Sequence, residues 1–182
     1  MKKVFFIAVL FVSTTVFSQN KLMTKIGIIS FESTDEVFNN VKATNNGVTC
    51  VLNPTTGEIA ALGLVKEFRF KIALMEEHFN ETYVESATFP KAIFRGNIAD
   101  FDVKLLSSAA KEFTLNGTLE LHGKTAPLKI ILLIKKTASE IQIISQFTVI
   151  STDFGIKIPT LSKKSLTNGI QIKLNFALST AK

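Results

Sequence analysis

Residues 112–122 read EFTLNGTLELH, and apolar and polar side chains alternate along them almost without error. The odd positions of this stretch are apolar or small: Phe113, Leu115, Gly117, Leu119 and Leu121. Only a β-strand turns alternate side chains to opposite faces, so the stretch has one buried and one solvated face. This period of two decides the fold class.

The same alternation recurs in other stretches of the second half of the chain, namely 91–98, 126–136, 140–151 and 166–178. Many long strands with a single buried face are typical of a closed or nearly closed antiparallel sheet. We therefore predict an all-β fold, an antiparallel β-barrel of about eight strands. Eight strands enclose roughly the space of one small ligand.

The first half of the chain supplies the remaining strands. Residues 25–33 (KIGIISFES) predict a first strand, and residues 48–52 and 58–64 flank the turn formers of 53–57, which indicates a hairpin. Residues 65–72 also alternate, so they predict a further strand.

The period then changes over residues 73–83 (ALMEEHFNETY). Met75, Phe79 and Tyr83 recur at steps of four, and the residues between them are mostly polar. This spacing predicts a short amphipathic helix, which we expect to lie across one end of the barrel.

The first 18 residues have the layout of a secretory signal peptide. Lysines follow Met1, an apolar run spans 4–12, and the small residue Ser18 ends the segment. The run is too short for a membrane span, although a retained anchor is the alternative interpretation. We expect residues 1–18 to be removed, residues 19–182 to form a single domain, and the protein to be periplasmic or secreted.

The one cysteine, Cys50, excludes an internal disulfide. It lies far from the predicted cleavage point, so no lipid is expected on it and no stable membrane anchor is predicted. Its neighbours Val48–Leu52 form an apolar strand, where a buried structural thiol is more common than a nucleophile.

The net charge of +6 falls to +4 when Lys2 and Lys3 leave with the signal peptide. No basic stripe interleaves with aromatic residues, so nucleic acid is not an expected partner. Pairs such as Lys135–Lys136 suit anionic lipid head groups, or they are simply solvated lysines.

The residues that carry chemistry are few. The two histidines, His78 and His122, have no second ligand nearby in the sequence, and no serine has a nucleophile-elbow context. We predict no catalytic residue, no metal site and no cofactor, and hence no enzyme.

Three segments in order, 77–98, 122–127 (HGKTAP) and 153–159 (DFGIKIP), together resemble the YceI-like family of exported, lipocalin-like barrels that bind polyisoprenoids. The N-terminal third departs from the family pattern, because Ser30–Ser33 stands where a tryptophan is usual and the chain has none. The resemblance implies a carrier of an isoprenoid lipid, a quinone or a prenyl phosphate, bound inside the barrel. Because burial of hydrocarbon contributes roughly 25 cal/mol per Å², an apolar tunnel suffices for affinity.

The predicted tunnel residues share an apolar side chain and an expected position facing the barrel interior or its mouth: Phe68, Phe70, Phe79, Phe94, Ile98, Phe113, Leu115, Leu119, Leu121, Ile143, Phe147, Phe154, Ile172 and Leu174. The alternative is that these side chains fill the barrel, in which case the protein is a non-catalytic interaction protein of the envelope.

Two further surfaces carry predictions. We expect the helix of 73–83 and the loop of 153–159 to frame the opening, with His78, Asn80 and Asp153 as head-group contacts or as braces of these connections. Outward-facing apolar residues of the strands, Ile131, Leu133, Ile144 and Ile150, predict an exposed patch and a possible homodimer contact.

Overall fold

The structure is a computed structural model that describes residues 21–33, 41–157 and 169–180. Within these ranges the strands are β1 (Leu22–Ser33), β2 (Lys42–Leu52), β3 (Glu58–Leu64), β4 (Arg69–Phe70), β5 (Lys91–Ile98), β6 (Lys111–Leu121), β7 (Lys124–Lys136), β8 (Ile141–Ile150) and β9 (Gly169–Thr180). The helical segments are η2 (Val65–Glu67), α1 (Ala73–His78), η3 (Phe79–Tyr83), η4 (Val103–Leu105) and η5 (Ser151–Phe154). The predicted signal peptide, residues 1–18, lies outside the described residues. So do residues 158–159 of the predicted loop and residues 166–168 of the last predicted strand.

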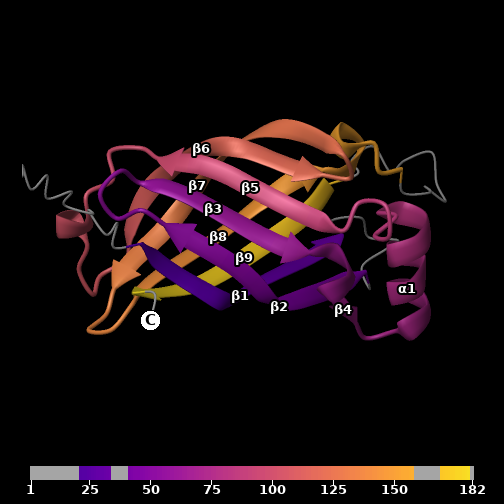
Figure 1. Ribbon diagram of the computed structural model, residues 1–182, viewed down its shortest axis with the longest axis horizontal. Coiled ribbons are helices and arrows are strands. Elements are labelled where there is room, and N and C mark those ends of the chain that lie inside the picture. The colour runs from indigo at the N-terminus through magenta and orange to yellow at the C-terminus, as the bar shows by residue number, and fades with distance from the viewer. Residues whose placement is uncertain (1–20, 34–40, 158–168, 181–182) are drawn as a thin grey trace, which may run out of the picture.

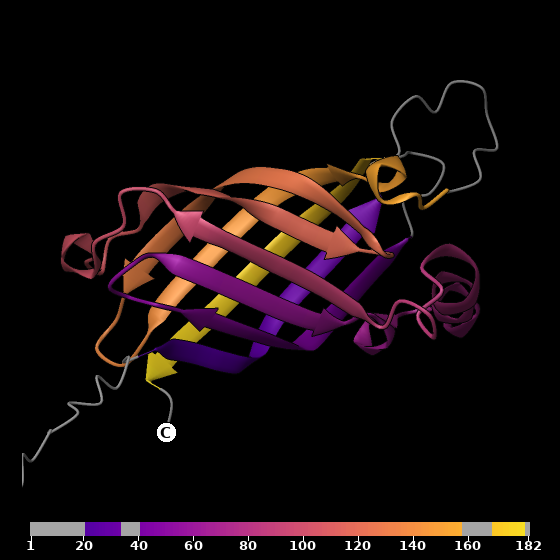
Figure 2. The same ribbon diagram turned by 45° about the horizontal axis from the view of Figure 1, so that its top comes forward.

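Eight antiparallel strands close into a barrel, as predicted, and β4 is added outside the closed ring. The strand order is β1-β9-β8-β7-β6-β5-β3-β2, and pairing between β1 and β2 closes the ring. Figures 1 and 2 show the strands wrapping around a common axis, with α1 at one end of the barrel and η4 at the other. None of the described helices is long and apolar enough to span a membrane.

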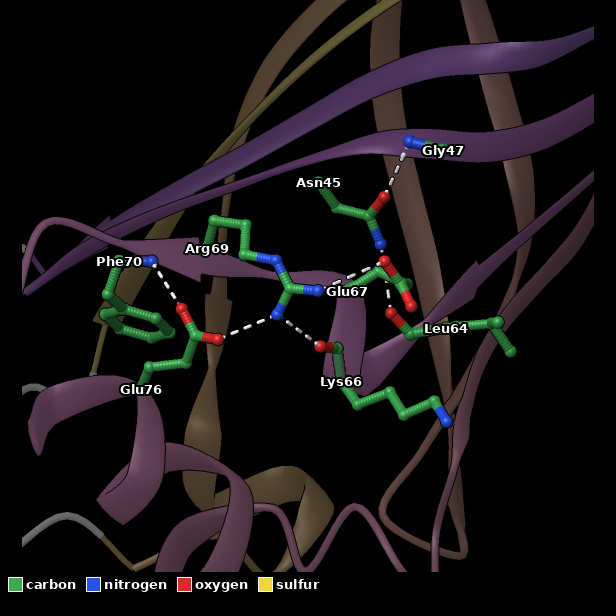
Figure 3. Close-up of polar contacts among 8 residues, drawn as sticks. All are labelled: Asn45, Gly47, Leu64, Lys66, Glu67, Arg69, Phe70 and Glu76. Carbon is green, nitrogen blue, oxygen red and sulfur yellow. Dashed lines mark hydrogen bonds and ion pairs between the residues drawn. The ribbon is translucent and has the colours of Figure 1, made fainter. Parts of the chain in front are cut away.

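The prediction of a strand over residues 65–72 is wrong for most of its length. The chain turns instead through η2, and only Arg69 and Phe70 pair, with Thr44 and Ala43 of β2. At the end of β3 the Asn45 side chain donates a hydrogen bond to the carbonyl oxygen of Leu64 at 2.9 Å, so a side chain of β2 occupies this backbone acceptor (Figure 3).

The helix over 73–83 is confirmed, with α1 passing into the wider turn η3. The carboxylate of Glu76, on α1, accepts hydrogen bonds from the Phe70 backbone N–H at 3.1 Å and from the Arg69 guanidinium at 2.7 Å (Figure 3). The N–H of Phe70 and then the charge of Arg69 lower the pKa of Glu76 below its ordinary value of 4.5. Glu76 therefore ties the helix to β4.

The buried side chains form two clusters, one in each half of the barrel. The larger cluster fills the half away from α1 with tightly buried residues such as Leu52, Ile98, Leu132, Ile143 and Leu178. The smaller cluster, Val65, Val84, Val149, Phe154 and Ile156, lies toward α1 and η5. The barrel interior thus differs between its two halves.

Candidate ligand cavity

A cavity of about 240 Å³ occupies the half of the barrel toward α1. Leu128 and Phe147 contact both buried clusters, and they therefore lie at the boundary between the filled half and the cavity. Pockets for drug-sized molecules usually measure roughly 300–1,000 Å³. The cavity is therefore small for a ligand site.

Nine of the predicted tunnel residues line this cavity. They come from the end of η2, from η3 and η5, and from β5, β6, β8 and β9: Phe68, Phe79, Phe94, Leu119, Leu121, Phe147, Phe154, Ile172 and Leu174. Their contact with a ligand stays a prediction.

The other five predicted tunnel residues lie elsewhere. Ile98, Phe113, Leu115 and Ile143 belong to the larger buried cluster, where their exposed fractions are 6% or less. They face inward as the alternation predicts, and they pack among the buried residues of that cluster rather than in the cavity lining. Phe70, on β4, packs outside the cavity lining, against the rings of Phe31 and Phe79.

Phenylalanine rings gather where the helical segments meet the barrel. Phe31, Phe68 and Phe79 line the cavity, and the centroids of their rings lie 5.2 to 6.1 Å apart. These tilted and edge-to-face arrangements are the favoured ones for aromatic pairs. Sequence reasoning missed Phe31, which lies on β1 in the region where the family pattern is broken.

The end of the cavity is braced by His122 at the turn between β6 and β7. Its Nδ1 lies 3.1 Å from the carbonyl oxygen of Phe154, and its Nε2 lies 2.9 Å from the Glu85 carboxylate. The Phe89 ring packs edge-on against the imidazole at a centroid distance of 4.6 Å. His122 therefore joins η5 to the segment that follows η3. That the helix of 73–83 and the loop of 153–159 frame the opening stays a prediction.

The three predicted head-group residues do not line the cavity. His78 and Asp153 are exposed. Asn80 is half-buried, and its side-chain N–H donates to the carbonyl oxygen of Glu76 at 2.9 Å, which braces η3 against α1. Their contact with a head group stays a prediction.

The polar groups of the cavity wall are few. Among the described lining residues none is charged, and the hydroxyl groups belong to Ser33, Tyr83 and Ser151. In the described part of the chain, no group of three or more His, Cys, Asp or Glu side chains is placed to hold a metal ion. The arrangement can enclose hydrocarbon, and it offers little to a charged molecule.

Outside the barrel, the predicted apolar patch is exposed, with exposed fractions of 51% for Ile131, 41% for Leu133, 38% for Ile144 and 39% for Ile150. The first three line a surface groove of about 490 Å³ that also contains Glu112 and Lys173. The predicted homodimer contact at this patch stays a prediction.

The chain is similar to known proteins in sequence pattern and in fold. Residues 17–178 match the family of YceI-like domains. No curated protein matches the chain. A polyisoprenoid-binding domain from Saccharophagus degradans, implicated in plant cell wall breakdown, superposes with a TM-score of 0.74 at 14% identity, over 90% of this chain and 99% of that one.

Two further solved structures share the fold. BcnA of Burkholderia cenocepacia has a TM-score of 0.68 at 13% identity, over 85% of this chain and 96% of its own. The YceI protein of Campylobacter jejuni has a TM-score of 0.61 at 16% identity, over 79% of this chain and 86% of its own. At these identities the likeness concerns the fold.

Proposed function

Because the chain belongs to the YceI-like domain family, we propose that it is an exported, non-catalytic carrier that holds a long-chain isoprenoid lipid in its barrel. The single observation that carries the proposal is the apolar cavity inside the barrel, beside its larger buried cluster. The Saccharophagus degradans domain, whose fold is shared, is a polyisoprenoid-binding domain, which supports the choice of ligand class.

The energetics suit such a ligand. At roughly 25 cal/mol per Å², burying about 200 Å² of hydrocarbon contributes about 5 kcal/mol. The wall supplies apolar and aromatic side chains for this burial, such as Phe31, Leu119 and Ile172. Phe94 and Phe147 border the filled half and form the floor on which the end of the chain would rest.

We propose export because residues 1–18 have the layout of a secretory signal peptide. An exported carrier would be periplasmic or secreted. The absence of catalysis is proposed because the charged residues near the cavity end, such as Glu85 and Asp153, lie outside its lining. The described lining residues include no His, Asp, Glu, Lys or Cys, which are among the side chains that most often act as general acid or base.

Mass spectrometry of an organic extract from the purified protein tests the proposal. We expect an isoprenoid lipid in an amount approaching one molecule per barrel, and none in the extract of an unrelated exported protein purified in parallel. Folded protein whose extract contains no apolar molecule would contradict a carrier. It would favour the interaction protein that uses the outer patch of Ile131, Leu133 and Ile144.

A further inference from the structure

Part of the barrel wall between β7 and β8 has no ladder pairing. The antiparallel ladder of these strands joins residues 133–136 to residues 141–144 and ends there. Within this fully described part of the chain, β7 reaches back to Lys124 and β8 continues to Ile150 without further pairing between them. By contrast, β6 is paired with β7, and β8 with β9, along its whole length. We call the unpaired line between β7 and β8 the seam.

The backbone of β7 explains why the ladder stops. Thr137 donates its N–H to the carbonyl oxygen of Glu140 in the β7–β8 hairpin, so residues of odd number in β7 direct their backbone groups toward β8. Pro127 is one of them, and it has no N–H to donate. Ile131 is another, and its carbonyl oxygen accepts a hydrogen bond from the Ser145 side chain at 2.5 Å. Both features oppose a continued ladder.

The cavity lies directly behind the seam. Leu128 and Ile130 of β7 line the cavity, and so do Phe147 and Val149 of β8. All four belong to the unpaired parts of the two strands. The wall that separates the cavity from solvent is therefore without a ladder where these residues face each other.

The surface groove of about 490 Å³ begins on the outer side of the same strands. Ile131 and Leu133 of β7 and Ile144 of β8 line it with exposed apolar side chains. Leu174 of β9 lines both the groove and the cavity, so the two spaces approach each other at this residue. An apolar surface thus leads up to the seam from outside, and the apolar cavity follows it inside.

We infer that the hydrocarbon chain of the lipid enters and leaves the cavity through the seam, and that the outer groove is its first binding site. The inference rests on the proposed function, because it concerns the ligand of the same cavity. Parting a paired ladder breaks backbone hydrogen bonds, whereas the seam has no ladder to break, so the wall opens more easily there. A chain that lies in the groove is already partly removed from water before the strands part.

Two cysteine pairs that share one position provide the test. Lys129→Cys with Thr148→Cys spans the seam, because the β7–β8 register, when continued, places these two exposed residues opposite each other. Lys129→Cys with Asn116→Cys spans the intact ladder of β6 and β7, where the two exposed residues are paired, and is the matched control. A short bis-methanethiosulfonate cross-links each pair, and a reductant removes it. Cys50 is buried, so we expect it not to react.

The probe is geranylgeraniol, added to delipidated protein. Tyr83 is the one tyrosine of the chain and lines the cavity, so its fluorescence in a stopped-flow instrument follows uptake and release. We expect the cross-link over the seam to slow both rates by roughly tenfold or more, because the strands can no longer part, and such gating motions limit ligand exchange. The affinity should stay unchanged, and reductant should restore both rates. The control cross-link should leave the rates at those of the wild type.

Amide hydrogen exchange tests the seam without a ligand. The N–H groups of Gln146 and Thr148 on the unpaired part of β8 should exchange faster than those of Gln142 and Ile144, which belong to the ladder. Equal protection of the two sets would show a continuous ladder in solution and would overturn the inference.

The inference is also overturned if the cross-link over the seam changes the rates no more than the control cross-link does. These outcomes leave the proposed function standing, because geranylgeraniol still binds. Failure of the wild type to bind geranylgeraniol would overturn the proposed function and the inference together.

Discussion

At the scale of single residues, two glycines shape the cavity floor. Gly96 on β5 and Gly117 on β6 are paired across the sheet, and the Phe94 ring lies over both. A Cβ atom at Gly117 would meet the carbonyl oxygen of Arg95 and would lie 2.6 Å from the Phe94 ring. The close approach of the two strands therefore requires glycine here.

We predict that Gly117→Ala lowers the free energy of unfolding by about 1–3 kcal/mol, the usual effect of overpacking. Urea denaturation measures it. Gly47→Ala is the matched control, because a Cβ there would lie 3.6 Å from its nearest neighbour, the Asn45 side chain. Equal stabilities of the two variants would show that the contact at Gly117 is relieved without strain.

Cys50 gives a second prediction at this scale. Its side chain is fully buried, and burial raises the pKa of the thiol to about 12. Both effects suppress the reactive thiolate. We expect a thiol-specific reagent at neutral pH to modify the folded protein only as fast as the barrel opens, and to modify it at once in denaturing urea. Rapid modification of the native protein would contradict the burial.

How far the sequence predicts the site also depends on individual residues. The inward position of Ser151 can be predicted from the sequence, because it continues the inward parity of β8. It is missed when only apolar inward residues are counted. The hydrogen bonds of His122 to Glu85 and Phe154 cannot be predicted from the sequence, because three connections far apart in the chain bring these groups together. Alternation assigns a face to a residue and says nothing of its partners.

At the scale of elements, the longer strands and the helix follow from periodicity, whereas β4 does not. Residues 65–72 alternate as a strand does, yet a strand also needs a neighbour with free backbone groups. The chain leaves the ladder at Leu64, whose carbonyl oxygen is taken by Asn45, and Arg69 binds Glu76 of α1 (Figure 3). The alternation still places Phe68 on the buried side.

The link between α1 and β4 predicts a dependence on pH. The pKa of Glu76 is lowered in the folded protein, so the unfolded chain takes up its proton first as the pH falls. The stabilisation is thus complete above the ordinary value of 4.5 and is lost as the pH falls below it. Glu32 acts in the same direction, because Lys173 and then Lys42 lower its pKa.

We expect Glu76→Gln to reduce the fall in melting temperature between neutral pH and acid below 4.5, since one of the titrating groups is removed. Thermal denaturation followed by circular dichroism measures the difference. Glu81→Gln, an exposed position on the neighbouring η3, is the control and should keep the wild-type dependence. An acid dependence of Glu76→Gln equal to that of the wild type would contradict the assigned role.

At the scale of the whole molecule, the sequence predicts a closed barrel but not how much of it is empty. A filled and a hollow barrel have the same alternation, since the residues face inward in both. Phe113 and Leu119 both lie on β6, yet Phe113 packs in the larger cluster and Leu119 borders the cavity. Ile143 on β8 and Ile172 on the neighbouring β9 differ in the same way. Whether the barrel is filled at a given height depends on the summed volume of the inward side chains at that height. Which side chains share a height is known only once the register of all eight strands is known.

We propose that this cavity holds the ligand, and two adjacent alanines of β3 test the proposal. Ala61 lines the cavity, and Ala60 is exposed on the outer face. The decisive measurement is the molar ratio of co-purified apolar molecule to protein in Ala61→Phe and in Ala60→Phe. We predict that Ala61→Phe folds and loses most of its ligand, because the ring occupies the cavity, and that Ala60→Phe keeps the wild-type ratio. Folded Ala61→Phe that carries as much ligand as Ala60→Phe would contradict the claim.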